Sequence, residues 1–166
     1  MYMVTLMKIT LLDDEMKECI ALTVPEERED YVDSNAVSLS RDFEHNRRKL
    51  SVWESRAIYA DGKMVGLVSY NYYIDDPVYK ETCYRIRPFA VDRDSADHGY
   101  EKAVIVTLLD EIRKKPHGEA EAVFATYHPD EGDMAAFFEN LGFVKTDLDW
   151  AAEDDECKDV IVRLAI

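Results

Sequence analysis

The stretch VDRDSADHGYEKAVIVTLLDEIRKK, residues Val91–Lys115, predicts the end of a strand, then a polar loop and a helix. Apolar residues recur along this helix at the spacing of one face: Tyr100, Val104, Leu108 and Ile112. Free amides and the dipole at the start of such a helix favour an anion such as a phosphate group. Asp97 and Glu101, however, flank Gly99 at positions where a bound phosphate favours glycine. The stretch therefore predicts a phosphate cradle altered by two acids.

The composition predicts one soluble globular domain over residues 1–166. Hydrophobic residues make up 47% of the chain and charged residues 33%, which is not typical of a disordered protein. No apolar run approaches the ~20 residues of a membrane span, and the N-terminus does not resemble a signal peptide. We therefore expect a cytoplasmic protein. The formal net charge of -15 disfavours nucleic acid and anionic membranes as partners, and it attracts cations.

The cysteines and histidines do not follow the spacing of a metal site or a disulfide framework. Cys19, Cys83 and Cys157 are widely spaced and odd in number, and we expect all three to be reduced. The four histidines are scattered, without cysteines or carboxylates at the spacing of zinc or iron ligands. We therefore expect no metal.

Periodicity and turn signals predict the order β-α-α-β-β-β-α-β-α-β-β. Strands are expected at residues 3–10, 53–59, 64–73, 83–91, 120–127, 143–149 and 159–165. Helices are expected from residue 13 or 14, from 23 to about 48 with a break left open, from about 98 to the breakers at 113–118, and at 134–141. The fold class is α/β (α+β), with a mixed, mostly antiparallel central sheet of about six to seven strands and helices on both faces.

Two local signatures within this order resemble the GNAT N-acetyltransferase superfamily. The stronger is MAAFFENLGF, residues 134–143, which is similar to the family's late helix and next strand, A-x-x-L-Y-x-x-x-G-F. The other is FAVD at 89–92, followed by a loop that opens a helix with GYEK at 99–102, similar to the acetyl-CoA motif Q/R-x-x-G-x-G/A. Residues 22–39 look like a segment of bacterial spermine/spermidine (diamine) N-acetyltransferases, although an ordinary amphipathic helix pair satisfies the same pattern.

The resemblance implies that acetyl-CoA is the co-substrate. In the family, the strand before the central helix splays from its neighbour, and its backbone pairs with the pantetheine; by position these residues are Phe89, Ala90 and Val91. The pyrophosphate is expected at the loop and the helix start, beside His98, Gly99, Tyr100 and Lys102. Glu131 stands where an asparagine often contacts the cofactor.

Amine acetylation needs a neutral amine, a donor for the oxyanion and a proton for the leaving thiolate. In much of the family a tyrosine supplies that proton, but this chain has Phe138 at the matching position. Tyr127 is the nearest substitute in sequence, with core packing as its alternative role. Glu81 is a candidate for removing the proton of the amine, with water as the alternative.

The predicted acceptor site rests on acids and tyrosines. Four acids at helical spacings on the segment that resembles the polyamine enzymes are candidates for binding ammonium groups, although a solvated acidic face has the same pattern: Glu26, Glu27, Asp30 and Asp33. Tyr70 and Tyr72 point to one side of a strand, where they are suited to cation–π contact with an amine or to packing in the sheet.

Two functions remain open. One is an N-acetyltransferase that moves acetyl from acetyl-CoA to a small-molecule primary amine, such as the polyamines spermidine and spermine. The other is a catalytically impaired GNAT-fold protein that binds CoA weakly and acts as a binding or regulatory module. The altered loop and Phe138 favour the second, whereas the architecture and the acidic segment favour the first. A homodimer is compatible with the sequence.

Overall fold

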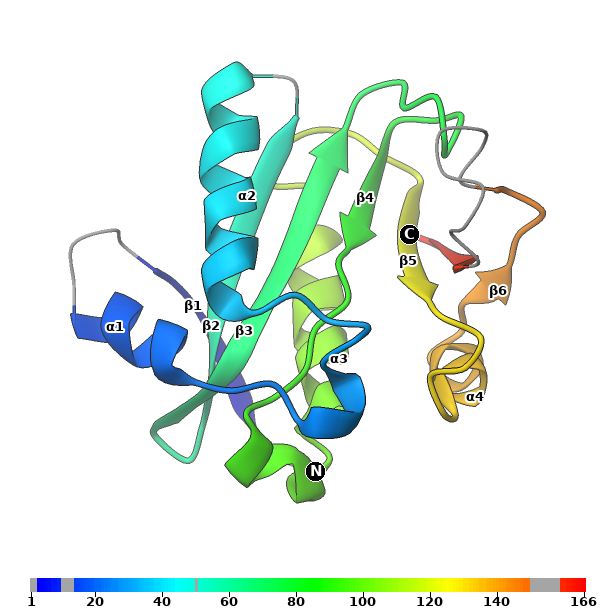
Figure 1. The fold of residues 1–166 in the computed structure, drawn as a ribbon. Coiled ribbons are helices and arrows are strands. Elements are labelled where there is room, and N and C mark those ends of the chain that lie inside the picture. Colours follow the sequence, from blue (N-terminus) through cyan, green and yellow to red (C-terminus); the bar gives the residue numbers. More distant parts are fainter. Residues whose placement is uncertain (1–2, 10–13, 50, 150–158) are drawn as a thin grey trace.

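The centre of the molecule is a mixed sheet of seven strands (Figure 1): β1 (Val4–Lys8), β2 (Val52–Ala60), β3 (Lys63–Tyr73), β4 (Cys83–Ile86), β5 (Ala122–Tyr127), β6 (Val144–Lys145) and β7 (Val160–Ala165). The computed structural model describes residues 3–9, 14–49, 51–149 and 159–166. The spatial order is β1-β2-β3-β4-β5-β7-β6. Neighbouring strands are antiparallel except β4 and β5, which are parallel.

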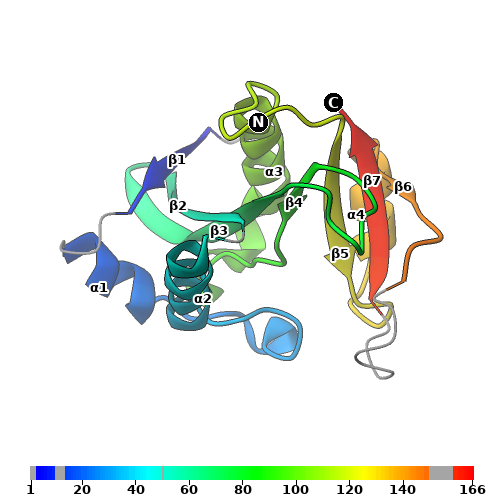
Figure 2. The ribbon, with the colours of Figure 1, turned by 90° about the horizontal axis from the view of Figure 1, so that it is seen from above.

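Helices cover both faces of this sheet (Figures 1 and 2). α1 (Asp14–Ala21) and α2 (Asn35–Arg48) lie on one face, and α3 (Tyr100–Ile112) and α4 (Met134–Asn140) lie on the other. Two 3-10 helices, Glu26–Arg28 and Arg93–His98, precede α2 and α3. The predicted fold class, a mostly antiparallel sheet with helices on both faces, is confirmed.

The apolar stripe of α3 holds this helix against the sheet. The four residues that the sequence predicted on this stripe are buried, and so are Ile105 and Leu109. Full burial of an aliphatic side chain contributes about 1.5–3 kcal/mol, so the stripe fixes the helix firmly. The first turn of α3 is thereby held close to the segment that follows β4.

Two strands are shorter than predicted. The strand expected at 83–91 ends at Ile86, because Pro88 has no amide proton for a ladder. The strand expected at 143–149 is reduced to β6, because the Thr146 hydroxyl donates to the Ile161 carbonyl and accepts from the Leu148 amide. Such a local side-chain turn replaces further strand pairing.

Two helix starts also differ from the prediction. The helical region expected from 23 to about 48 is broken, and α2 begins only after Ser34, whose hydroxyl accepts a hydrogen bond from the Val37 amide. The helix expected from about residue 98 begins at Tyr100, since Gly99 has a φ of 66° and separates it from the 3-10 helix.

Cys19 and Cys83 are buried free thiols. Burial raises the pKa of Cys19 to about 11 and that of Cys83 to about 12, which makes both inert at neutral pH. Cys157 lies outside the described residues, as do Thr10 and Asp13 of the predicted first elements. Within the described ranges, no three His, Cys, Asp or Glu side chains gather as a metal site, and no helix is long and apolar enough to cross a membrane.

Candidate active site

β4 and β5 run side by side and then separate (Figures 1 and 2). Their last paired residues are Ile86 and Ala125. Beyond this point the chain follows β3, and the Arg87 amide donates to the Ser69 carbonyl at 2.9 Å. β5 instead continues along β7 to its own last residue. The two strands therefore open a wedge in the middle of the sheet.

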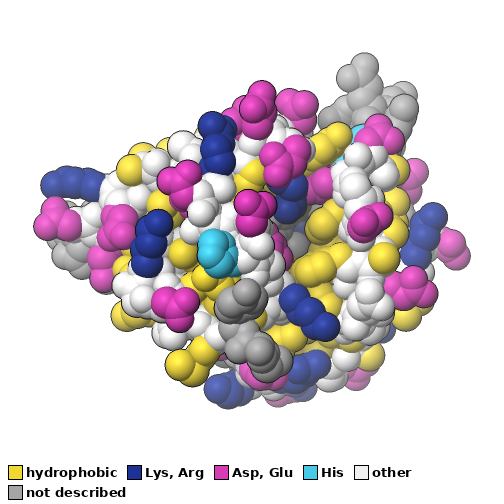
Figure 3. Space-filling model, turned by 90° about the horizontal axis from the view of Figure 1, so that it is seen from below, with side chains coloured by type: hydrophobic (Ala, Val, Ile, Leu, Met, Phe, Trp, Pro, Cys, Tyr) yellow, Lys and Arg dark blue, Asp and Glu magenta, His cyan; other side chains and the backbone are white. Residues whose placement is uncertain are grey.

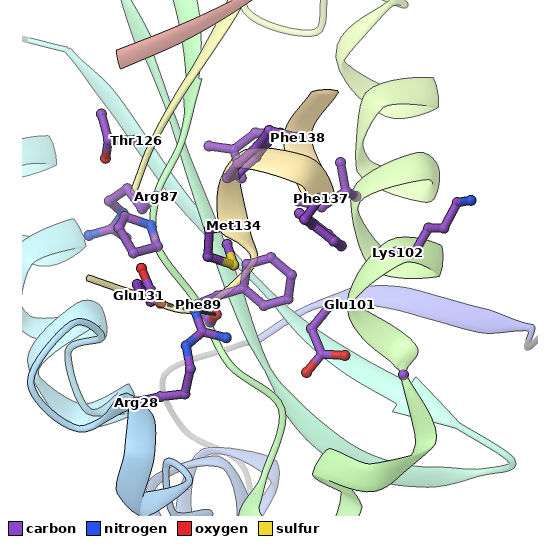
Figure 4. A pocket seen from close by; sticks show the side chains of 14 residues that line it. Arg28, Arg87, Phe89, Glu101, Lys102, Thr126, Glu131, Met134, Phe137 and Phe138 are labelled. Carbon is purple, nitrogen blue, oxygen red and sulfur yellow. Dashed lines mark hydrogen bonds and ion pairs between the residues drawn. The ribbon is translucent and has the colours of Figure 1, made fainter. Parts of the chain in front are cut away.

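A cavity of about 370 Å³ occupies this wedge (Figure 4). We call it the first cavity. Its walls are mainly apolar and come from the end of β4 and the segment after it, from α3 and from α4: Ile86, Phe89, Ile105, Met134, Phe137 and Phe138. Figure 3 shows the face that carries a hollow with hydrophobic side chains inside and charged side chains around it. The volume and the apolar walls are typical of a small-molecule site.

The start of α3 forms a polar part of the first cavity. No side chain caps this helix, so the amides of its first turn are suited to an anion. Glu101 and Lys102 line the cavity with opposite charges. Asp97 is exposed, does not line the cavity and caps neither α3 nor the preceding 3-10 helix. Of the two acids in the predicted cradle, the structure brings only Glu101 to the site.

The predicted cofactor residues divide into two groups. Four of them line the first cavity: Phe89, Gly99, Lys102 and Glu131. The other four lie beside it without lining it: Ala90, Val91, His98 and Tyr100. Val91 is fully buried and bridges Gly66 of β3, and the His98 ring stacks on Tyr100 with the centroids 5.2 Å apart.

Arg28 connects the two sides of the wedge (Figure 4). Its Nη2 lies 2.6 Å from Glu131 Oε1 and donates to the Phe89 carbonyl at 3.1 Å. The side chains of Arg28 and Glu131 are 17% and 5% exposed, so this ion pair is largely shielded from water. Glu131 is thus held by an arginine from the segment before α2. Sequence reasoning missed Arg28, because nothing local to it indicates a partner so distant in the chain.

Phe138 lines the first cavity, and Tyr127 packs behind it. Their rings stack with the centroids 5.9 Å apart, and Tyr127 is 9% exposed and does not line the cavity. Among the described lining residues, Thr126 carries the sole hydroxyl. Tyr127 therefore has the packing role that the sequence left as its alternative, and it does not reach the cavity as a proton donor in this structure.

Glu81 and the two tyrosines lie elsewhere. Glu81 accepts from Arg163 Nε at 2.8 Å and Nη2 at 3.2 Å, and it does not line the first cavity. Because this carboxylate is engaged by a cation away from the wedge, the structure does not support it as the general base. Tyr70 and Tyr72 are 1% and 7% exposed and belong to the main core. Both tyrosines pack in the sheet, and neither lines the first or the second cavity.

A second cavity, of about 290 Å³, lies between the sheet and the segment that leads into α2. Its lining includes Asp30, Arg85, Arg87 and Pro88. Arg87 and Pro88 line both cavities, so the two meet at these residues. Glu26 is exposed and lines neither cavity. Of the four acids predicted to bind the acceptor, Asp30 and Asp33 line the second cavity, and Asp33 is paired with Arg41.

The split strands and the uncapped helix beside them define the class of protein. The model of the acetyltransferase (GNAT) family matches residues 12–143, and the chain belongs to this family. Acetyl-CoA, the predicted co-substrate, is the acyl donor of this class of N-acetyltransferase. No curated protein matches the sequence well enough to be counted as a relative.

Solved structures share the fold at low sequence identity. The ribosomal-protein-S18-alanine N-acetyltransferase of Escherichia coli is 19% identical, with 99% of this chain and 94% of that chain covered and a TM-score of 0.64. The PaiA N-acetyltransferase of Thermoplasma acidophilum, in complex with coenzyme A, is 11% identical, with 99% of each chain covered and a TM-score of 0.63. A Bacillus subtilis acetyltransferase in complex with CoA is 15% identical, with coverages of 100% and 99% and a TM-score of 0.58.

Proposed function

We propose that the first cavity binds the acyl donor, and that the acetyl group passes to a primary amine held in the second cavity. The observation that carries this proposal is the meeting of the two cavities at Arg87 and Pro88. A molecule in each cavity has its reacting end at the same wall. The apolar walls of the first cavity suit the pantetheine arm, and the first turn of α3 suits the pyrophosphate.

The chemistry is a direct transfer. Acetyl-CoA supplies an activated thioester; the amine nitrogen forms a bond to its carbonyl carbon, the carbon–sulfur bond breaks, and the thiolate takes a proton. Phe138 has no proton to give, and Glu81 is not at the site to accept one from the amine. We therefore propose that water receives the amine proton and protonates the thiolate. The turnover rate should then rise toward pH 9, as the neutral fraction of the amine increases.

The comparisons do not support the polyamine acceptor indicated by residues 22–39. The second cavity has acids that suit ammonium groups, Asp30 and Asp159 among them, but Arg85 and Arg87 contribute positive charge to its wall. Like charges repel, so these arginines work against an acceptor with several ammonium groups. The similar E. coli structure is a ribosomal-protein-S18-alanine N-acetyltransferase. Protein N-termini and small amines other than polyamines are therefore acceptors to test beside spermidine and spermine.

The second candidate function, a weak CoA-binding or regulatory module, is favoured by one group of observations. Glu101 lies at the expected phosphate position, Phe138 replaces the usual acid, and Glu131 is held by Arg28. Binding of acetyl-CoA without turnover of any amine would support this candidate over the enzyme.

A cavity-filling variant tests the location of the donor site. Met134 lines the first cavity at the start of α4, whereas the adjacent Ala135 is exposed and does not line it. Met134→Trp should abolish the acetyl-CoA-induced rise in melting temperature and the release of free CoA with a panel of amines. Ala135→Trp, with the same side chain on the same helix, should retain both. If both variants bind acetyl-CoA like the wild type, the donor site is not in this cavity.

A further inference from the structure

The sheet face under α2 presents a row of polar side chains to the second cavity. Arg85 on β4 and Arg87 just after it line this cavity. One nitrogen of Arg87, Nη2, is ion-paired with Asp42 of α2. The Arg87 guanidinium also lies 4.6 Å from the centroid of the Trp53 ring, which holds it in place. The lining of the second cavity thus joins arginines to acids: Arg41, Arg85 and Arg87 against Glu29, Asp30, Asp33 and Asp159. Arg41 pairs with Asp33, and Glu29 pairs with Arg93.

Arg87 and the neighbouring Asn71 have side-chain donors without a hydrogen-bond partner in the described part of the chain. Arg87 is 7% exposed, and its Nε and Nη1 find no hydrogen-bond acceptor among the described residues. Asn71, which pairs with Arg85 across β3 and β4, is fully buried, and both of its amide atoms lack partners within the same described part of the chain. Unsatisfied buried donors cost free energy. Asn71 does not line the second cavity, but Arg87 does, so the free donors of Arg87 are suited to a ligand that accepts hydrogen bonds.

The position of Arg87 limits what that ligand is. Arg87 lines both cavities, so an anion bound to it lies next to the wall where the thioester is proposed to arrive. In an amino acid, the carboxylate and the amine are attached to the same carbon atom. A carboxylate on Arg87 therefore keeps the amine within a few ångströms of that wall. Asp30 and Asp159 also line the second cavity, and they disfavour a second negative charge on the ligand.

We propose that the acceptor is a small amine that also carries a carboxylate, a neutral or basic amino acid or a close analogue, and that Arg85 and Arg87 bind that carboxylate. This assignment rests on the proposed function, because it names the substrate class of the same second cavity. The carboxylate takes no part in bond making or breaking. It positions the amine, whose nitrogen forms the new bond to the acetyl carbon as the thioester carbon–sulfur bond breaks. Charge-assisted hydrogen bonds to a fixed guanidinium are the strong ones, which makes the carboxylate the main determinant of selection.

The direct test compares free amino acids with their carboxamides. The two differ in charge at one group, and the carboxylate also raises the pKa of the adjacent amine, so kcat/KM is compared per neutral amine, from the pH dependence of each substrate. The ratio of these corrected values isolates the binding of the carboxylate. We expect each neutral or basic amino acid to exceed its amide by about 10- to 100-fold, the range for a hydrogen bond to a charged group. Spermidine and an acidic amino acid should be poorer substrates than the neutral amino acid.

Two variants assign the preference to the arginines. Arg85→Met keeps the Asp42–Arg87 pair and should reduce the acid-to-amide ratio about tenfold or more, through KM, with acetyl-CoA binding unchanged. Arg48→Met removes the same charge from the exposed end of α2, where Arg48 pairs with Glu44, and should leave the ratio unchanged. Because Arg87 replacement endangers the buried pair, Arg87→Lys keeps the charge and should lower the ratio by removing the planar fork.

The outcomes separate this inference from the proposed function. The carboxylate assignment is wrong if amides or polyamines are acetylated as efficiently as amino acids, or if Arg85→Met leaves the acid-to-amide ratio unchanged. Neither result would contradict the proposed acetyltransferase activity. If acetyl-CoA binds and no amine is turned over, calorimetry with amino acid and CoA together decides: amino acid binding that Arg85→Met weakens supports the site, and no binding overturns it. Failure of acetyl-CoA itself to bind would overturn the proposed function instead.

Discussion

Neutralising Glu101 should tighten acetyl-CoA binding, whereas neutralising Asp97 should not. Glu101 is the second residue of α3 and lines the first cavity. We take roughly 6 Å as the distance between that carboxylate and a phosphate bound to the first-turn amides, because both belong to the same helical turn, whose length is about 5.4 Å. At 6 Å the repulsion between unit charges is about 3 kcal/mol for an effective dielectric of about 20, and about 0.7 kcal/mol in water. Glu101 is partly exposed, so we expect about 1–2 kcal/mol for Glu101→Gln, or about 5- to 30-fold in Kd.

Asp97→Asn is the matched control. It removes the same charge from the same loop, but Asp97 is exposed and does not line the cavity. Calorimetric titration with acetyl-CoA should give a change of less than about twofold, and the advantage of Glu101→Gln should shrink as salt shortens the Debye length. Equal tightening by the two variants would show that the overall charge acts from a distance. No tightening by Glu101→Gln would place the phosphates elsewhere.

Three further predictions concern the thiolate, the fold and its pH dependence. Phe138→Tyr places a proton donor at the cavity wall and should raise kcat about 100-fold or more in a free-thiol assay, with little change in the Kd of acetyl-CoA. An unchanged kcat would mean that the thiolate needs no acid. Gly118→Ala should destabilise the fold by about 2–4 kcal/mol in urea denaturation, because its Cβ would lie 2.3 Å from Tyr72 Oη, whereas Gly62→Ala, with nothing within 4 Å, should cost about 1 kcal/mol; equal costs would contradict the steric argument. Burial lowers the pKa of His117 below 6.5. The contribution of the neutral ring to stability is therefore present above pH 6.5 and is lost as the pH falls through the folded-state pKa. Between about pH 7.5 and about pH 5, the free energy of unfolding of His117→Gln should fall less than that of the wild type.

The sequence predicted the parts of the fold that depend on local patterns. The stripe of α3 was readable because its apolar residues recur at helical spacing and all of them are buried. The end of β4 was harder to predict, because the residues after Ile86 are as apolar as a strand and only Pro88 marks the change. The short β6 could not be predicted, since it depends on a side-chain turn at Thr146 that competes with strand pairing.

For the site, sequence reasoning located one wall and missed another. Gly99, Lys102 and Phe138 were found because motif positions are local, and each lines the first cavity. Arg28 could not be assigned, since its partners Glu131 and Phe89 come from segments that only the folded chain brings together. Glu81 was misplaced for a related reason, because its partner Arg163 lies on the last strand.

The meeting of the two cavities at Arg87 and Pro88 has a kinetic consequence. The first cavity has walls from α3 and α4 on one face of the sheet, and the second lies under α2 on the other face. The proposed occupants of the two cavities can therefore be bound at the same time. The proposed direct transfer uses no acetylated enzyme as a carrier between half-reactions. A direct transfer requires a ternary complex of the protein with both substrates. Double-reciprocal plots of initial rate against one substrate, at several concentrations of the other, should therefore give lines that intersect and are not parallel.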